Sequence, residues 1–80
     1  MELIKLVETI VSNLVTDPES ISVKEFPSEN EIVIQVMVPE NEMGRVIGKS
    51  GATISSIRTI VQASSYIKDN KRVNVNVDSY

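Results

Sequence analysis

The residues best suited to chemistry lie in one short segment, Gly44-Arg45-Val46-Ile47-Gly48-Lys49-Ser50-Gly51. Glycines on both sides of Lys49 and Ser50 permit a tight turn, because glycine adopts backbone conformations that other residues disfavour. If a helix begins at Ala52, this turn presents unpaired backbone N–H groups and the positive end of the helix dipole. Lys49 adds a mobile cation, and Ser50 adds a hydroxyl donor. The segment is therefore predicted to bind an anionic group such as a phosphodiester.

Three other functions or structures could account for these glycines. A nucleotide-binding P-loop needs four residues between its first glycine and Gly-Lys-Ser, whereas Gly44 is followed by only three. A membrane helix-packing motif, with Gly44 and Gly48 four residues apart, needs a surrounding apolar stretch of about 20 residues, which is absent. The third interpretation is a plain turn between two helices, which the glycines alone would satisfy.

Composition excludes most enzyme classes and shows where the charge lies. The 80 residues include no Cys and no His, so the usual thiolate nucleophiles, general bases and metal ligands are missing. We therefore expect no enzyme, no metal and no cofactor. The net charge is −3, but residues 1–44 carry two basic and nine acidic side chains, whereas residues 45–72 carry six basic and one acidic. The glycine segment thus lies at the start of a region with net charge +5, despite the acidic total.

The elements that position this segment follow from hydrophobic periodicity. Residues 3–16 have apolar side chains at helical spacing, and the helix should end by Thr16 because Asp17 precedes Pro18. Residues 21–26 and 31–38 alternate as strands around a polar turn at 27–30, which predicts a hairpin. Pro39 should end the second strand.

The second half of the chain predicts two helices and a strand. Asn41 is expected to cap a short helix through Ile47, and residues 52–66 resume helical spacing after the glycine turn. A turn at residues 69–71 leads to an alternating strand at 73–77. The predicted order is α-β-β-α-α-β in one α+β domain spanning residues 1–80.

The run from Val46 to Ile54, Val-Ile-Gly-Lys-Ser-Gly-Ala-Thr-Ile, closely resembles the signature of the KH domain. In that family a GXXG loop clamps about four nucleotides of a single strand. The element order matches the type II KH arrangement, which implies a three-stranded mixed sheet with three helices on one face. Within this superfamily, the chain is similar to the small bacterial single-KH-domain RNA-binding proteins of the KhpA family.

The resemblance implies a set of RNA-binding residues. Gly48, Lys49, Ser50 and Gly51 would form the clamp, and Gly44 would leave room for the passing strand. Ile47 would form the floor of the groove, and Arg45 and Arg58 would add cations at its rim. Ser55 lies on a polar helix stripe with Gly51, Arg58 and Gln62. Ile54 would contact bases, although its spacing favours core packing. Met37 or Gln35 would line the far wall. Lys71 and Arg72 lie outside the signature and are expected to be solvated charges.

The function implied by this resemblance is single-stranded RNA binding by a cytoplasmic RNA chaperone or post-transcriptional regulator. The resemblance also implies homodimerisation or pairing with a Jag-family (KhpB/EloR) RNA-binding protein, and links to cell shape and cell-wall homeostasis. The aromatic residues are only Phe26, Tyr66 and Tyr80, so backbone contacts are expected to contribute more than base stacking. The alternative function is a KH-fold protein-interaction module that does not bind RNA, with the first helix or Ile60 as its contact.

Overall fold

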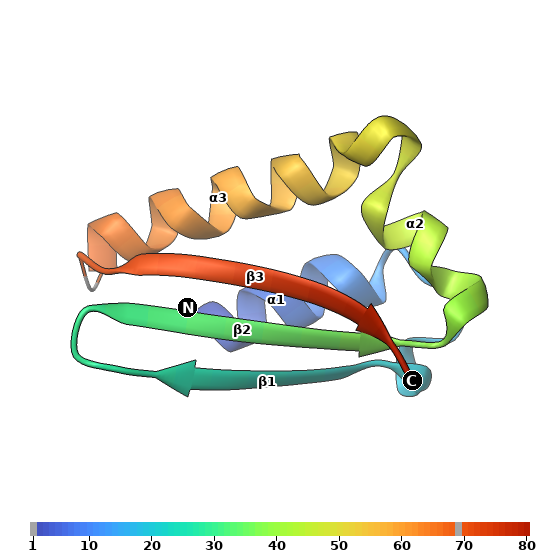
Figure 1. Ribbon diagram of the computed structural model, residues 1–80, viewed down its shortest axis with the longest axis horizontal. Coiled ribbons are helices and arrows are strands. Elements are labelled where there is room, and N and C mark those ends of the chain that lie inside the picture. Colours follow the sequence, from blue (N-terminus) through green and yellow to red (C-terminus); the bar gives the residue numbers. More distant parts are fainter. Residues whose placement is uncertain (1, 69) are drawn as a thin grey trace.

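The computed structural model describes residues 2–68 and 70–80 and confirms the predicted order of elements (Figure 1). Helices α1 (Leu3–Ser12), α2 (Met43–Ile47) and α3 (Ala52–Lys68) accompany strands β1 (Ser22–Pro27), β2 (Glu31–Val38) and β3 (Arg72–Ser79). Helix α1 ends at Ser12, and Asn13 donates its backbone N–H to the Ile10 carbonyl as the chain turns. Of the predicted turn at 69–71, Asp69 lies outside the described residues.

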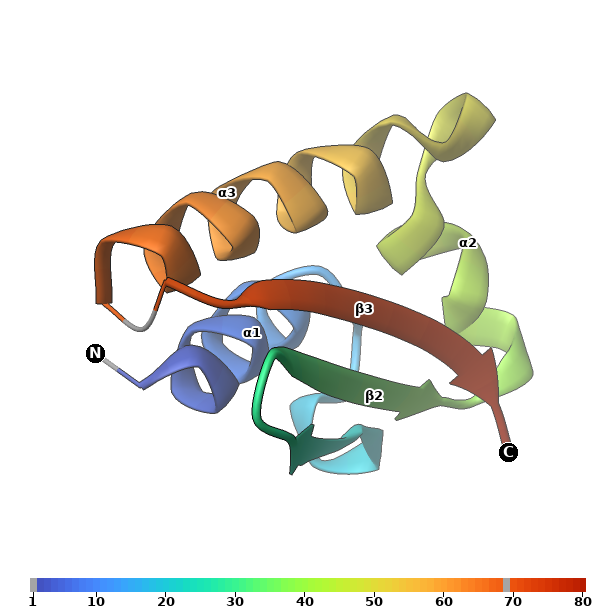
Figure 2. The same ribbon diagram turned by 60° about the vertical axis from the view of Figure 1, so that its left-hand side comes forward.

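The sheet is mixed, with the strand order β1-β2-β3. Strand β1 is antiparallel to β2, from Ser22 opposite Met37 to Pro27 opposite Ile32, as the hairpin prediction requires. Strand β3 runs parallel to β2, and this connection contains α2 and α3. Both α1 and α3 lie on the same side of the sheet when Figure 1 and Figure 2 are compared. Because the strand order is β1-β2-β3, β3 is an edge strand. Its outer edge lies next to α3, whose side chains bond to it.

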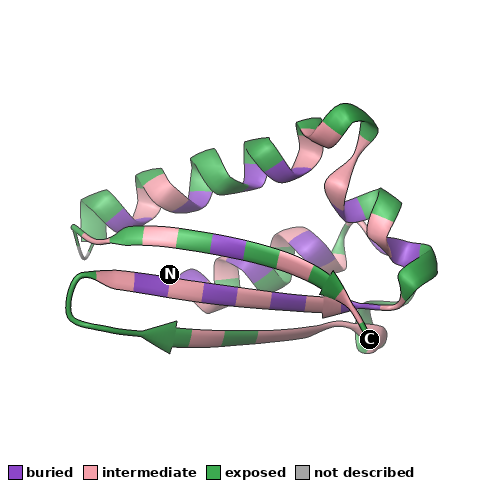
Figure 3. Cartoon of the chain, viewed as in Figure 1, coloured by how far each residue is buried: buried purple, intermediate pink, exposed green. Residues whose placement is uncertain are grey.

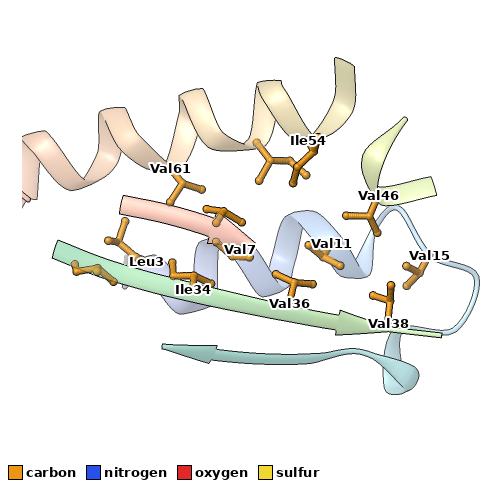
Figure 4. Packing of buried hydrophobic residues seen from close by; sticks show 13 residues of the cluster. Leu3, Val7, Val11, Val15, Ile34, Val36, Val38, Val46, Ile54 and Val61 are labelled. Atoms are coloured by element: carbon orange, nitrogen blue, oxygen red, sulfur yellow. The ribbon is translucent and has the colours of Figure 1, made fainter. Parts of the chain in front are cut away.

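The core lies between the sheet and the helices. Along β2 the even-numbered residues are buried and the odd-numbered ones are only half-buried, so a single face of the strand is covered (Figure 3). Val7 and Val11 of α1 are buried in the same cluster as Ile34 and Val36 (Figure 4). Val46 of α2 is also fully buried there, which anchors the short helix that precedes the glycine turn.

The start of the short helix differs from the prediction. Asn41 is not a helix cap: it lies inside a 3₁₀ turn, Glu40–Glu42, whose N-terminal flanking residue is Pro39. The backbone N–H of Glu42 donates to the Pro39 carbonyl at 2.8 Å, and α2 follows directly from Met43. Pro39 itself has an extended backbone, with ψ 148°, so the turn begins after it and has no side-chain cap.

Candidate nucleic-acid interface

The turn between α2 and α3 has a backbone that requires glycine at two positions. Gly48 ends α2 with φ +78° and ψ 174°, and Gly51 has φ +76°. A Cβ added to Gly48 would lie 2.1 Å from Thr53 Oγ1 and 2.9 Å from the Thr53 backbone nitrogen. A Cβ added to Gly51 would meet nothing within 4 Å. Gly48 is therefore needed for both conformation and close packing, whereas Gly51 is needed for conformation alone.

Between the two glycines, the backbone passes from the right-handed to the left-handed helical region. Lys49 keeps a negative φ, whereas Ser50 adopts φ +57° and ψ 26° in the left-handed region. A right-handed residue followed by a left-handed one turns successive N–H groups to the same side, which is the geometry of anion-binding nests. The side chains of Lys49 and Ser50 are both exposed. The N–H groups of Gly48 and Gly51 donate to the Gly44 and Gly48 carbonyls, at 2.9 and 3.2 Å. The loop therefore presents the backbone of Lys49 and Ser50, a hydroxyl and a cation at the tip between the two helices.

Arg45 precedes the loop on α2 and is tied to the protein by an ion pair. Its Nε lies 3.0 Å from Glu42 Oε1, and the Arg45 side chain is 55% exposed. Part of its charge is thus neutralised by Glu42, and the rest of the guanidinium faces solvent. Arg45 thus lies three residues before Gly48 on α2, with its guanidinium paired to Glu42.

Glu42 is the main polar residue of this region that the sequence did not predict. Its side chain is buried. Its Oε2 accepts hydrogen bonds from the Thr16 backbone N–H at 2.7 Å, the Thr16 hydroxyl at 3.0 Å and the Asp17 backbone N–H at 3.4 Å. Glu42 therefore fastens the start of α2 to the segment that follows α1.

Two opposing effects set the pKa of Glu42. Burial by itself raises the pKa of the carboxyl, because it disfavours the charged form. The hydrogen bonds from the backbone and hydroxyl of Thr16, the backbone of Asp17 and the side chain of Arg45 outweigh burial, and they hold the pKa of Glu42 below its ordinary value. The carboxylate is thus charged at neutral pH and stabilises the fold there.

The apolar candidates of the interface separate into two groups. Ile54 is 7% exposed and belongs to the core cluster, as its helical spacing favoured, so little of its surface is available to a base. Ile47 is half-buried and packs against this cluster from the end of α2. Ser55 is exposed one turn into α3. A Cβ added to Gly44 would meet nothing within 4 Å, so that face of α2 is open.

Side chains of α3 bind the outer edge of β3. Arg58 Nε donates to the Val75 carbonyl at 3.1 Å. Gln62 makes two bonds: its Nε2 donates to the Lys71 carbonyl at 3.0 Å, and its Oε1 accepts from the Val73 N–H at 2.9 Å. An amide that bridges a carbonyl and the N–H two residues later pairs with the edge as a neighbouring parallel strand would. Gln62 thus protects an edge that would otherwise be open.

A groove of about 680 Å³ runs along this contact between α3 and β3. The strand that borders α3 is β3, not β2, so the prediction that Met37 or Gln35 lines the far wall is wrong. Met37 and Gln35 lie in the central strand, on the face opposite the buried residues. The contact between α3 and the edge strand β3 depends on the tertiary fold, so the sequence of β2 does not predict it. The residues that line the groove are Arg58, Thr59, Gln62, Ala63, Tyr66, Arg72, Val73, Asn74, Val75 and Asn76.

Two of the residues treated as solvated charges have defined places. Lys71 Nζ donates to the Ser28 carbonyl at 2.9 Å and so joins the start of β3 to the β1–β2 turn. Arg72 is exposed and lines the groove. Arg72 lies one residue before the strand predicted at 73–77, and β3 begins at Arg72. The Lys71 contact spans 43 residues of sequence and has no local signal.

The α-β-β-α-α-β order, the parallel β2–β3 pair and a GXXG turn between two helices on one face of the sheet together define a type II KH domain. The sequence comparisons agree. The family described as KhpA/KhpB, KH domain, matches residues 4–77. This chain therefore belongs to the KhpA/KhpB family of KH domains, which is not a family of enzymes.

Individual relatives match over nearly the full chain. The RNA-binding protein KhpA of Clostridium perfringens is 42% identical over 73 residues, which cover 91% of this chain and 96% of that protein. The protein of the same name from Clostridium acetobutylicum is 40% identical with the same coverage. The one from Thermotoga maritima is 36% identical over 91% of this chain and 95% of its own.

Among solved structures, the fold is similar to a part of Era. One Era structure, in complex with MgGDPNP and a segment of 16S ribosomal RNA, superposes with a TM-score of 0.67 at 23% identity, over 96% of this chain. A GDP·AlF4⁻-bound variant of Aquifex aeolicus Era gives 0.69 at 20% identity. The chain spans 29% of the length of each Era chain, so the likeness concerns the fold of one portion. Within residues 2–68 and 70–80, no helix combines the length and the apolar character needed to cross a membrane.

Proposed function

We propose that this protein binds single-stranded RNA through the loop from Gly48 to Gly51. The observation that carries the proposal is the backbone of this loop, where Ser50 and both glycines have positive φ and Lys49 and Ser50 are exposed. Such a loop places N–H donors and one cation against a phosphate without a Cβ between them. Four relatives of similar length support RNA as the ligand, since each is named an RNA-binding protein.

The shape of the surroundings favours a single strand over a duplex. The loop joins two helices, and the groove between α3 and β3 is bordered by one helix and one edge strand. Single-strand recognition by KH domains uses a loop of this kind on about four nucleotides. Contacts to the phosphate backbone carry little sequence information, which suits an RNA chaperone or a post-transcriptional regulator acting in the cytoplasm. The link to cell shape and cell-wall homeostasis stays an expectation from the family resemblance.

The direct test is a loop variant, Lys49→Asp with Ser50→Asp, in an electrophoretic shift assay with short single-stranded RNA at low salt. We expect the variant to lose RNA binding and to keep its thermal unfolding temperature, because both side chains are exposed. The matched control is Lys24→Asp with Asn30→Asp, which changes net charge equally at exposed positions of β1 and the β1–β2 turn. It should still bind. A folded loop variant with wild-type affinity would show that the loop is not the clamp.

The salt dependence of RNA affinity is a second test of the contact between the loop and phosphates. Two or three phosphate contacts predict a slope of about −1.4 to −2 for log K against log salt, at about 0.7 per contact for single strands. A slope near zero would mean that the phosphates are not bound.

We further propose that the protein self-associates, or pairs with a Jag-family (KhpB/EloR) protein, through the outer face of α3. Ile60 is 50% exposed and Ile67 is 88% exposed, with Ala63 between them on the same helix face. A second clamp in a dimer would strengthen weak RNA binding through effective concentration. Sedimentation should show that Ile60→Glu shifts a dimer to monomer, and a monomeric wild-type protein would contradict self-association. A dimer that shifts no RNA would favour the interaction-module alternative.

A further inference from the structure

The glycine loop is attached to a helix that is too short to be stable by itself. Helix α2 has five residues, and an isolated helix of that length does not form in water because nucleation is unfavourable. The loop continues directly from α2, since the Gly48 N–H donates to the Gly44 carbonyl at 2.9 Å. The position of the loop therefore depends on the contacts that hold α2 to the rest of the protein. Val46 makes one of these contacts from the core, where it is fully buried.

Glu42 makes the polar contact at the start of α2, and it uses both carboxylate oxygens. Its Oε2 accepts from the hydroxyl and the backbone N–H of Thr16 and from the Asp17 N–H. Its Oε1 accepts from Arg45 Nε at 3.0 Å. Glu42 is only 3% exposed, and donors on both oxygens hold a buried carboxylate in one orientation. Arg45 is thus bonded to a group that is itself fixed by a distant part of the chain.

Arg45 keeps most of its hydrogen-bonding capacity in this arrangement. A guanidinium has five N–H donors in a rigid plane, and the contact with Glu42 takes the one on Nε. Within residues 2–68 and 70–80, the donors on its two terminal nitrogens make no hydrogen bond, and the side chain is 55% exposed. Gly44 beside it is exposed and has no side chain, so a strand of RNA can approach this face of α2.

The spacing along α2 suits a ligand that contacts the loop and Arg45 together. Arg45 and Gly48 are three residues apart, which is about 4.5 Å along a helix axis. Successive phosphates of one stacked strand are about 3.4 Å apart along its axis. These distances are comparable, so a single strand can place one phosphate at the loop and another, one or two nucleotides away, at Arg45.

We propose that Glu42 is a positioning residue of the RNA site, whose fixed carboxylate holds the Arg45 guanidinium in the orientation that binds a phosphate next to the loop. This inference rests on the proposed function and deepens it. A free arginine would have to be ordered when it binds a phosphate, and Glu42 orders Arg45 beforehand. Ordering one long side chain corresponds to a change in affinity of about two- to twelvefold.

The test is a double-mutant cycle on RNA affinity, measured by fluorescence anisotropy with an adenylate decamer. Glu42→Gln should weaken binding about two- to twelvefold. Arg45→Gln should weaken it at least as much and lower the salt slope by about 0.7. The double variant should bind as Arg45→Gln does, because Glu42 acts through Arg45. Arg45→Lys keeps the charge but lacks the planar fork, so it should not restore the affinity. The matched control is Ile34→Val, which lowers stability from the core, away from α2, and should bind as the wild type does.

A second readout needs no RNA and would not follow from a merely structural role. In the NMR spectrum of ¹⁵N-labelled protein, the Nε–H of Arg45 should exchange slowly with water, because it is bonded to Glu42. Arg58, whose Nε donates to the Val75 carbonyl, is the slow reference, and the exposed Arg72 is the fast one. In Glu42→Gln the exchange should accelerate at Arg45 and stay unchanged at Arg58.

The outcomes separate this inference from the proposed function. If the wild type binds RNA but the two losses in the cycle are additive, Glu42 acts on stability alone and the loop clamp stands. Tighter binding by Glu42→Gln would also overturn the inference, because Glu42 would then mask Arg45. If Glu42→Gln does not fold, Arg45→Lys decides, since wild-type affinity in that folded variant contradicts the inference. If the wild type binds no RNA, the proposed function and this inference fail together.

Discussion

The loop geometry makes a quantitative prediction for Gly48→Ala, with Gly51→Ala as its matched control. Both glycines have nearly the same positive φ, +78° and +76°. With ψ of 174°, Gly48 lies in a region that is essentially restricted to glycine, at a cost of about 1–3 kcal/mol for another residue. A Cβ there would also lie 2.1 Å from Thr53 Oγ1 and 2.6 Å from Thr53 Cβ, whereas a Cβ at Gly51 meets open space.

Comparing the two substitutions separates the energetic cost of the backbone conformation from the cost of steric overlap. Overpacking costs about 1–3 kcal/mol, so Gly48→Ala should lower the free energy of unfolding by about 2–6 kcal/mol. Gly51→Ala should lower it by about 1–2 kcal/mol, the cost of a left-handed conformation alone. Because small domains have a total stability of about 5–15 kcal/mol, the first change removes a large share of it.

The assay is urea-induced unfolding followed by far-ultraviolet circular dichroism, with the slope m checked for constancy. A double-mutant cycle with Thr53→Ala adds a further test, since that change removes the hydroxyl but leaves the Thr53 Cβ in contact. The cycle should therefore recover only part of the Gly48→Ala loss. Equal losses for Gly48→Ala and Gly51→Ala would refute the packing argument.

Two more predictions concern side chains that hold the interface in place. Glu42→Gln should lower stability at neutral pH, because the folded-state pKa of Glu42 is depressed and its contribution is fully present above the unfolded pKa of about 4.3. That contribution is lost as pH falls through the folded pKa, so unfolding curves of the two proteins should converge in acid; a constant difference at all pH values would contradict this. Gln62→Ala leaves the Val73 N–H without its partner and should lower stability by about 1–3 kcal/mol. Hydrogen exchange at Val73 should accelerate in this variant, and an unchanged rate there would show that Gln62 does not protect the edge.

The order of elements and the glycine turn between α2 and α3 could be predicted because their signals are local. Alternation along β2 and the spacing of glycines around Lys49 depend on neighbouring residues in the sequence, and the structure reproduces both. The predicted start of α2 is wrong, since Asn41 is a good cap by type but lies inside the 3₁₀ turn Glu40–Glu42 that precedes the helix.

What could not be predicted depends on contacts between distant segments. Glu42 is buried because Thr16, 26 residues earlier, supplies donors to its carboxylate. Gln62 pairs with β3 only because the parallel register brings the edge strand next to α3. Neither contact has a signature in residue type, since Glu and Gln are ordinary surface residues on helices. The groove that includes Tyr66 depends on the same register.

The central claim, that the loop from Gly48 to Gly51 clamps single-stranded RNA, is tested most directly by NMR. A titration of ¹⁵N-labelled protein with an adenylate tetramer should shift the amide signals of Gly48, Lys49, Ser50 and Gly51 first and furthest. The open face of the sheet, with Gln35 and Met37, should be unaffected. If the largest shifts appear there, or if no amide of the loop moves while RNA binds, the loop is not the RNA clamp.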